Sequence, residues 1–255
     1  MTVHFIGAGP GAADLLTLRA VRLLRESPMC LYAGTYLDPE VLGNCAPDAE
    51  LIDTQGLSLD EIVAHCARAD AEGADVARLC SGDPSIYSAL TEQTRRLDAR
   101  GIAWDVTPGV PAYAAAAAVL GSELTVPEVV QSVVLTRTRA RSTAMPDSEA
   151  LGNFARTRAS LVLHLAITRI RELTTELSDE YGADCPAVVV YRASQPRQQV
   201  LRGTLADIAD QVEAAGLQQA AVVLVGRALT PAIDCAQSHL YDPRRDRNPV
   251  SGSGC

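Results

Sequence analysis

The segment "CSGDPSIYSAL" (80–90) brings a glycine, a carboxylic acid, a proline and a tyrosine together directly after an apolar run. Gly82 can adopt backbone angles that are closed to other residues, so we expect a positive φ there and the close approach of a ligand. Asp83 followed by Pro84 is typical of a helix N-terminus, with Asp83 as the N-cap and Pro84 as the first helical residue. The unpaired N–H groups of such an end favour polar and anionic ligands. The segment therefore predicts a ligand-binding turn, with a plain helix start as the alternative.

A second glycine-rich turn, "GAGPG" (7–11), follows the first apolar run. Its position suggests a nicotinamide-dinucleotide site, but the spacing is GxGxG rather than GxGxxG. Pro10 removes one backbone N–H from the loop that would hold a pyrophosphate. The next apolar run ends in Tyr32-Ala33-Gly34, without an acid for a ribose hydroxyl. A strand-to-helix turn without a dinucleotide remains the alternative for this segment.

All 22 basic residues are arginines, and the sequence contains no lysine. Every fixed cation is therefore a planar guanidinium, which suits carboxylates and phosphates. Five arginines are candidates for binding an anionic substrate: Arg137, Arg139 and Arg141 in "TRTRAR", together with Arg192 and Arg197. The alternative is an arginine-rich loop in solvent, which is common on protein surfaces.

Composition and charge exclude several classes of protein. The net charge of −9 argues against a nucleic-acid partner. The seven cysteines are widely spaced without a CxxC pair and the four histidines are scattered, so we expect neither a disulfide framework nor a metal site. The longest apolar run, 112–120, is too short to span a bilayer. With no signal peptide visible, we expect a cytoplasmic protein that does not bind membranes.

The elements that position these turns alternate along the first half of the chain. Apolar runs at 3–6, 29–32 and 75–80 predict strands. Helices are predicted from Asp14 as N-cap, from the Ser58/Glu61 capping box to Gly73, and from Asp83 to Gly101. This βαβα order implies a parallel sheet with flanking helices.

The prolines and glycine of "TPGVPAY" (107–113) interrupt this rhythm, and we place a domain junction there. The predicted domains are 1–110 and 111–241, followed by a disordered tail at 242–255. The second half contains four apolar runs, a helix at 204–216 and two short extended pieces within "YRASQPRQQVLRG". This pattern predicts an α/β domain with a mixed sheet. In open α/β sheets ligands bind at the carboxyl ends of strands, so we expect the ligand cleft between the two domains.

Four segments occur in the order "GAGPGAADLLTLRA", "SGDPSIY", "TPGVPAYAAAA" and "VVLVGRAL". Together they resemble the tetrapyrrole methylase family of S-adenosylmethionine-dependent enzymes, over residues 3 to about 230. The stretches "AAAAAVLGSELTVPEVVQSVVLTRTRARSTAMPDSEAL" and "SGDPSIYSAL" are most similar to the branch that methylates carbon 11 of precorrin-4 in cobalamin synthesis.

The resemblance implies two α/β domains, S-adenosyl-L-methionine as co-substrate, S-adenosyl-L-homocysteine as product, a tetrapyrrole substrate and a homodimer. By alignment, the residues that contact the methyl donor are Pro10, Ser81, Gly82, Asp83, Ile86, Tyr87, Pro111, Ala112, Leu165 and Ala193. The five arginines are the candidates for the carboxylates of the ring, since arginine and carboxylate form matched pairs. No catalytic base is identified; Tyr87 and Tyr113 are possible hydrogen-bonding groups.

The sequence also departs from the family pattern. Uroporphyrinogen methylases of the family carry an Asp-Arg pair where this chain has Ala33-Gly34, which argues against the uroporphyrinogen reaction. Ser81, Pro111-Ala112 and Ser88 replace a glycine, a serine pair and a glycine. The open alternatives are methylation at another ring carbon, diphthine synthesis, a sensor of S-adenosylmethionine without turnover, and a nicotinamide-dependent oxidoreductase.

Overall fold

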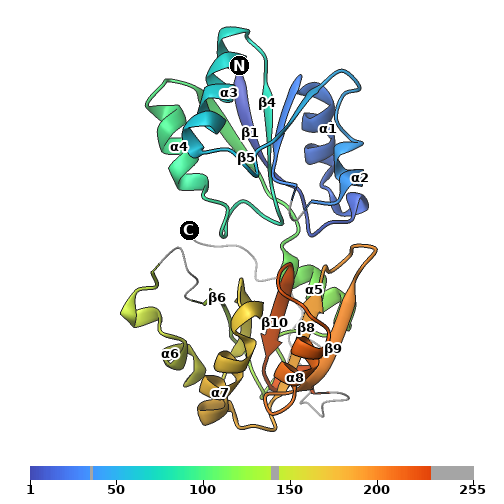
Figure 1. The fold of residues 1–255 in the computed structure, drawn as a ribbon, viewed down its shortest axis with the longest axis vertical. Helices are drawn as coiled ribbons and strands as arrows, with labels where there is room; N and C mark the ends of the chain where they lie inside the picture. The colour runs from blue at the N-terminus through green and yellow to red at the C-terminus, as the bar shows by residue number, and fades with distance from the viewer. Residues whose placement is uncertain (35–36, 139–143, 231–255) are drawn as a thin grey trace, which may run out of the picture.

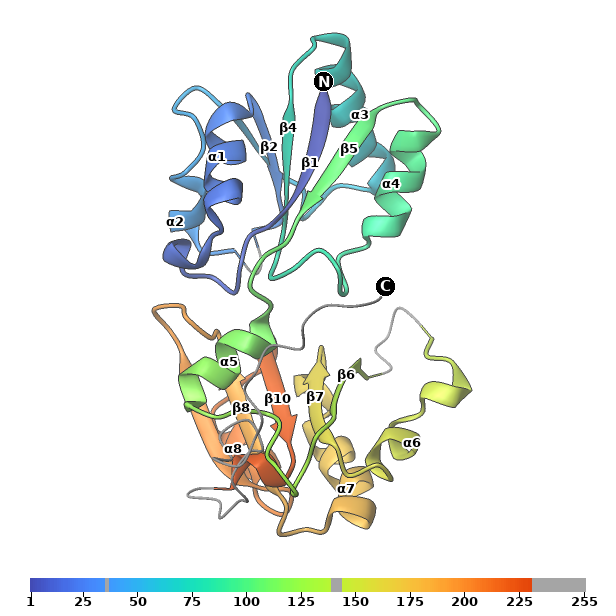
Figure 2. The same cartoon turned by 180° about the vertical axis from the view of Figure 1, so that it is seen from behind.

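The computed structural model of the protein describes residues 1–34, 37–138 and 144–230. Two five-stranded sheets form its upper and lower halves, each covered by helices (Figures 1 and 2). The expected class, an α/β protein with a parallel and a mixed sheet, is confirmed. In the described part of the chain, no helix is both long enough and apolar enough to cross a membrane.

The first sheet is entirely parallel, with the strand order β3-β2-β4-β1-β5. Its strands are β1 (Thr2–Gly7), β2 (Met29–Tyr32), β3 (Glu50–Asp53), β4 (Val76–Cys80) and β5 (Ala103–Thr107). The central strand β4 is completely buried, in keeping with its continuous apolar pattern. Arg78 is the exception, since it is a charged residue in the middle of that buried strand.

Helices cover both faces of the first sheet (Figures 1 and 2). One face packs against α1 (Leu18–Glu26) and the short α2 (Pro39–Leu42). The other face packs against α3 (Leu59–Ala71) and α4 (Leu90–Asp98). The alternation of β4 explains this division, because Ala77 and Leu79 point to the first pair of helices and Val76 and Cys80 to the second.

The second sheet is mixed, with the strand order β6-β7-β10-β8-β9. Its strands are β6 (Val133–Arg137), β7 (Ser160–His164), β8 (Pro186–Tyr191), β9 (Gln199–Thr204) and β10 (Ala221–Val225). Only β6 and β7 pair in parallel, and the other neighbours are antiparallel. The two extended pieces predicted around "YRASQPRQQVLRG" are the end of β8 and the strand β9.

The helix α5 (Ala112–Leu120) packs on one face of the second sheet, and α6 (Leu151–Ala155), α7 (Ile170–Tyr181) and α8 (Ile208–Ala214) pack on the other. Small alanines let α5 lie close to the sheet, since Ala115 and Ala116 are buried against Val162 and Leu224. The predicted junction, 107–113, is the connection from β5 to α5 (Figure 2).

Several helix starts differ from the prediction. Asp14 lies in a short 3-10 helix, Ala13–Leu15, and the α1 N-cap is Thr17, whose hydroxyl accepts a bond from the Ala20 N–H. The capping box of Ser58 and Glu61 is confirmed. The helix expected from Thr204 begins at Ile208, because the Asp207 side chain bonds the Thr204 N–H and holds a turn there.

The helix expected from Asp83 begins only at Leu90. Tyr87 and Ala89 have φ values of 55° and 54°, which break helical geometry before that residue. Asp83 is therefore not a helix N-cap, and the prediction was wrong on this point. The end of the helix was predicted correctly, since Gly101 has a φ of 69° just beyond α4.

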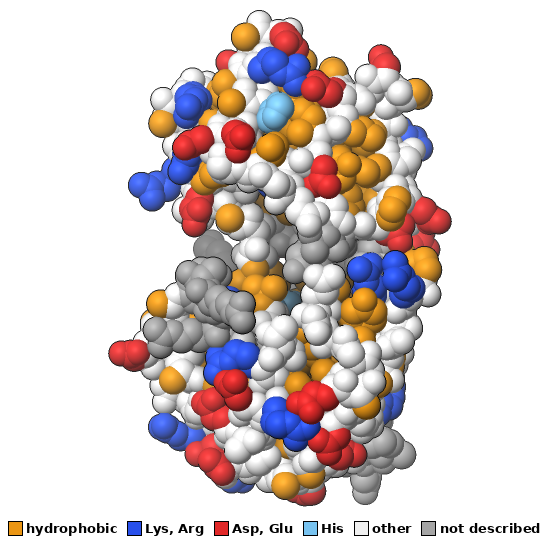
Figure 3. Space-filling view, viewed as in Figure 1, with side chains coloured by type: hydrophobic (Ala, Val, Ile, Leu, Met, Phe, Trp, Pro, Cys, Tyr) orange, Lys and Arg blue, Asp and Glu red, His pale blue; other side chains and the backbone are white. Residues whose placement is uncertain are grey.

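The two sheets direct their strand ends toward each other. The carboxyl ends of β1, β4 and β5 point at the second half, and those of β6, β7 and β8 point at the first (Figures 1 and 2). The surface is indented on one side at the level between the two halves (Figure 3). The loops that carry the predicted site residues lie at this level, whereas the predicted tail (242–255) falls outside the described residues.

Candidate active site

Three glycine turns of the first half pack backbone against backbone. Gly9 and Gly82 exchange hydrogen bonds, at 3.1 Å from Gly9 N–H to the Gly82 carbonyl and 2.8 Å in the reverse direction. A Cβ at Gly109 would lie 2.3 Å from the carbonyl oxygen of Gly82, and one at Gly7 would lie 2.4 Å from the Gly109 nitrogen. Gly82 has the positive φ that we predicted, +70°. The loops after β1, β4 and β5 thus form one rigid backbone platform.

Asp83 joins two of these loops. One carboxylate oxygen accepts a 2.8 Å bond from the Ser85 N–H and the other a 2.8 Å bond from the Gly109 N–H. Partial burial opposes its ionisation, but the hydrogen bonds from Ser85 and Gly109 prevail and lower the pKa of Asp83. The ionised carboxylate therefore links two loops of the platform. It is a poor general base, because both of its oxygens already accept hydrogen bonds.

The loop 84–89 projects Tyr87 toward the second half of the molecule. The loop contains two left-handed residues, Tyr87 and Ala89. Gln93 holds the end of the loop, since its amide donates to the carbonyls of Ser88 (3.2 Å) and Ala89 (3.3 Å). Backbone strain of this kind persists only where neighbouring groups enforce it, and it concentrates at functional sites.

Gln93 is in turn held by the buried Arg78. The Arg78 guanidinium donates to the Gln93 side chain at 2.9 Å and to the Thr54 hydroxyl at 3.0 Å. Burial lowers the pKa of Arg78. Sequence reasoning missed this pair; the only available signal was an arginine in the middle of an apolar strand.

The second half contributes the ends of β6 and β7. His164 is the last residue of β7 and lies beside Arg137 of β6 in the strand register. The next residue, Leu165, has a φ of 53° and is 53% exposed, and its carbonyl accepts a 3.5 Å bond from the Thr138 hydroxyl. The His164 ring packs against Tyr87 of the first half, with 5.4 Å between ring centroids and 51° between planes. Aromatic side chains from both halves therefore meet at this point.

A second contact joins the halves beside "GAGPG". Gln195, in the loop after β8, donates its amide to the Pro10 carbonyl at 2.9 Å, and the Ser194 hydroxyl accepts a 3.2 Å bond from the Ala12 N–H. The Gln195 side chain is 9% exposed and fills the space beside Gly11. This contact uses the Pro10 carbonyl, so it does not need the backbone N–H that a proline lacks.

The residues predicted to contact the donor fall into two groups. The first six, Ser81, Gly82, Asp83, Ile86, Pro111 and Ala112, lie on the loop after β4 and the connection from β5 to α5. These segments adjoin, since a Cβ at Gly82 would lie 3.6 Å from Pro111 and Ala112. The other four lie where the two halves meet. Pro10 and Tyr87 belong to the first half, and Leu165 and Ala193 follow β7 and β8 of the second. Tyr87 contacts His164, and the Pro10 carbonyl accepts a bond from Gln195. Leu165 and Tyr87 expose apolar surface toward solvent, at 53% and 47%.

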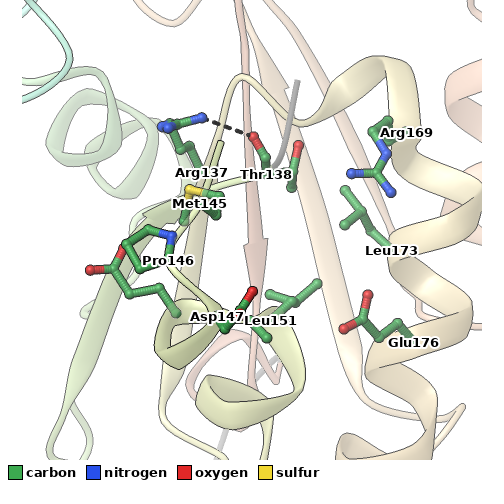
Figure 4. Close-up of a pocket in the computed structure, with 11 residues that line it drawn as sticks. Arg137, Thr138, Met145, Pro146, Asp147, Leu151, Arg169, Leu173 and Glu176 are labelled. Carbon is green, nitrogen blue, oxygen red and sulfur yellow. Dashed lines mark hydrogen bonds between the residues drawn. The ribbon is translucent and has the colours of Figure 1, made fainter. Parts of the chain in front are cut away.

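A pocket of about 210 Å³ opens beside the end of β6 (Figure 4). Arg137, Met145 and Pro146 form one side, and Arg169, Leu173 and Glu176 of the α7 region form the other. Arg137 donates to the carbonyls of Thr138 and Ala144, at 3.4 and 3.3 Å. Asp147 and Glu149 make the same pocket partly acidic.

The other candidate arginines are distributed differently. Arg192 donates to the Gln195 side chain at 3.0 Å and to the Tyr191 hydroxyl at 2.9 Å, so it supports the contact with Pro10. Arg197 is exposed in the same loop and does not line the pocket beside β6. Arg139 and Arg141 lie outside the described residues.

The model of the tetrapyrrole (corrin/porphyrin) methylases matches residues 2–209. The chain belongs to this family. Among its relatives, the precorrin-4 C(11)-methyltransferase of Rhodococcus erythropolis is 58% identical over 97% of this chain and 99% of its own length.

Two solved structures of tetrapyrrole methylases share the fold. A cobalt precorrin-4 methyltransferase, described as a cobalamin biosynthetic enzyme, has a TM-score of 0.87 and 34% identity, covering 90% of this chain and 96% of that one. The uroporphyrin-III C-methyltransferase of Thermus thermophilus in complex with S-adenosyl homocysteine has a TM-score of 0.76 and 28% identity, covering 90% and 93%. Membership in this family favours the interpretation of "GAGPG" as part of a methylase site over a site for a nicotinamide dinucleotide.

Proposed function

We propose that the protein transfers the methyl group of S-adenosylmethionine to carbon 11 of precorrin-4 in cobalamin biosynthesis. The observation that carries this proposal is the 58% identity, over nearly the whole of both chains, to a precorrin-4 C(11)-methyltransferase. The fold agrees, since a cobalt precorrin-4 methyltransferase superposes over 90% of the chain.

The methyl donor is proposed to bind between the glycine platform and the loops after β7 and β8. The place fits such a ligand for a physical reason: Gly7, Gly82 and Gly109 let the loops after β1, β4 and β5 pack backbone against backbone at the carboxyl ends of three parallel strands, where open α/β sheets bind ligands. The homologous uroporphyrin methylase in complex with S-adenosyl homocysteine supports the choice of ligand.

The bound donor supplies an activated methyl group with its own leaving group. The protein then has mainly to hold the acceptor carbon about 3 Å from that methyl and in line with the sulfur. A platform fixed by Asp83 and by the exchanged bonds of Gly9 and Gly82 provides the necessary rigidity on one side. The exposed apolar surface of Leu165 and Tyr87 provides a place for a flat ring on the other.

The carboxylates of the ring are proposed to meet arginines, with Arg137 as the first candidate because it lines the pocket at the end of β6. A second candidate substrate is the cobalt-containing ring, since a solved relative is named for it. The metal-free ring is favoured, because the relative named for it is 58% identical and the cobalt enzyme 34%.

The test is to incubate the purified protein with methyl-labelled donor and precorrin-4, with and without cobalt in the ring. The expected product carries one new methyl group at carbon 11, located by NMR, and forms faster from the metal-free ring. A label at another carbon would refute the position, and tight donor binding without any product would indicate a sensor.

The same proposal includes a homodimer in the cytoplasm. Val133 and Leu135 on the edge strand β6 are 36% and 37% exposed, which suits a surface covered by a second copy. Light scattering should give twice the monomer mass of 26.9 kDa at micromolar concentration, and cell fractionation should recover the protein with cytoplasmic markers.

A further inference from the structure

His164 presents an unusual nitrogen at the meeting point of the two halves. Its Nε2 is buried and has no hydrogen-bond partner among the described residues. Buried polar atoms are nearly always paired, so an unpaired one calls for an explanation. The residue stands at the end of β7, immediately before Leu165, and the Tyr87 ring of the opposite half packs against it. The unpaired nitrogen therefore lies between two loops that are proposed to contact the methyl donor.

Other ionisable groups near this point are already engaged or poorly suited to accept a proton. Both oxygens of Asp83 accept backbone N–H groups. Burial raises the pKa of Tyr87, so its phenol stays protonated at neutral pH. Arg137, beside His164 on β6, is a permanent cation, and Arg137 and Glu149 act electrostatically on Tyr87 in opposite directions. Burial lowers the pKa of His164, which leaves its imidazole neutral and able to accept a proton.

We infer that His164 is the proton acceptor of the methyl transfer, with Tyr87 as the cover that keeps water from its Nε2 until the tetrapyrrole binds. This inference rests on the proposed function. A catalytic role explains why Nε2 has no partner among the residues that the structure describes, since its partner is then the substrate. The strained loop that carries Tyr87, held by Gln93 and Arg78, explains how the cover is kept in place.

The electron pair of the ring carbon, reinforced by the neighbouring ring nitrogen, forms the new C–CH3 bond, and the C–S bond breaks with its pair on sulfur. The ring nitrogen then bears a positive charge and loses its N–H proton to Nε2 of His164. The positive charge that entered on the sulfonium thus ends on the imidazolium, and no oxidant or reductant is needed.

The experiment compares the wild type with His164→Gln and with the control His65→Gln on α3. Single-turnover rates with precorrin-4 are measured between about pH 5 and pH 9, and S-adenosylhomocysteine binding is measured by calorimetry. We expect His164→Gln to lose about 10²-fold in rate, as for loss of a general base, and to keep its affinity for S-adenosylhomocysteine. Because burial lowers the pKa of His164, the wild-type rate should fall only at a pH below the ordinary histidine value of about 6.5. This acid limb should be absent from the residual rate of the variant.

A second readout does not depend on turnover or on the variant folding. In wild-type protein with ¹⁵N-labelled histidine and bound S-adenosylhomocysteine, addition of precorrin-4 should shift the Nε2 resonance of His164 and leave that of His65 in place. An unshifted resonance, or a His164→Gln enzyme with wild-type rate and the same acid limb, would overturn the inference. If the wild type itself fails to methylate precorrin-4, the proposed function falls and the inference falls with it, whereas an active wild type with an indifferent His164 refutes the inference alone.

Discussion

Gly109 lies so close to Gly82 that a Cβ at position 109 would stand 2.3 Å from the Gly82 carbonyl oxygen and 2.8 Å from the Gly7 Cα. Backbone atoms of three loops cannot all move aside, so Gly109→Ala should destabilise the protein by about 3 kcal/mol or more, above the range typical of overpacked cores. Urea unfolding measures the loss. Gly56→Ala is the matched control, because a Cβ there meets nothing within 4 Å; an equally small effect at both positions would contradict the packed platform.

Gly82→Val tests the donor site rather than the packing. A Cβ at Gly82 would find ordinary contacts of 3.6 Å to Pro111 and Ala112, but the φ of +70° strains any β-branched residue. We expect a folded protein that has lost S-adenosylhomocysteine binding in calorimetry. Wild-type affinity in this variant would remove the loop from the donor site.

Asp83→Asn should make the platform less stable in a pH-dependent manner. The folded protein holds the pKa of Asp83 below its ordinary value near 4, so the unfolded chain takes up the proton first as the pH falls. The carboxylate thus contributes stability above about pH 4 and loses it as the pH falls through the lower folded value. The wild type and the variant should differ in unfolding free energy by about 1 kcal/mol or less, because the group is largely exposed. This difference should be largest at pH 6 and should shrink toward pH 3. A difference that stays constant over this range would show that the charge is irrelevant.

Gln93→Ala should release the loop that carries Tyr87. The change removes the acceptor of a buried guanidinium and the donor to two carbonyls, which together cost about 2–4 kcal/mol. We expect faster proteolysis within 84–89 and a higher KM for the tetrapyrrole. Gln211→Ala, which removes a comparable amide near the surface of α8, should leave both unchanged.

Arg137→Ala should weaken tetrapyrrole binding and spare donor binding. A charge-assisted contact in a desolvated site is worth roughly 1.5–3 kcal/mol, against well under 1 kcal/mol for a surface pair, so the KM should rise by tenfold or more. Arg137→Lys should not fully restore it, because the ammonium lacks the planar fork. Arg25→Ala on α1 controls for lost positive charge, and an unchanged KM in Arg137→Ala would direct attention to Arg192 and Arg197.

Much of the architecture follows from local rules of the sequence. The apolar runs predicted β1, β2, β4 and the strands of the second half, and the capping box of Ser58 and Glu61 fixed one helix start. Gly82 was assigned its positive φ from its place between a strand end and Asp-Pro. These features depend on neighbours in the chain, which is why they can be read from residue types alone.

The interior of the site depends on contacts between distant residues. Asp83 braces Gly109 instead of capping a helix, because the left-handed Tyr87 and Ala89 delay α4 to Leu90. The pairing of Tyr87 with His164, and of Gln195 with Pro10, joins residues from opposite halves of the chain. Periodicity and spacing in the sequence cannot predict contacts between such distant residues. The roles of His164, Gln93 and Gln195 were therefore not predicted.

The Gln195 side chain fills the space beside Gly11. A Cβ on any other residue at position 11 would lie only 2.2 Å from the Gln195 Cγ. We therefore expect positions 11 and 195 to depend on each other in evolution. A relative that replaces Gly11 must also shorten or redirect residue 195, and it then loses the bond to the carbonyl of residue 10. An alignment of close relatives should show these two columns varying together, although most of the chain separates them, and a single substitution at either one should be purged.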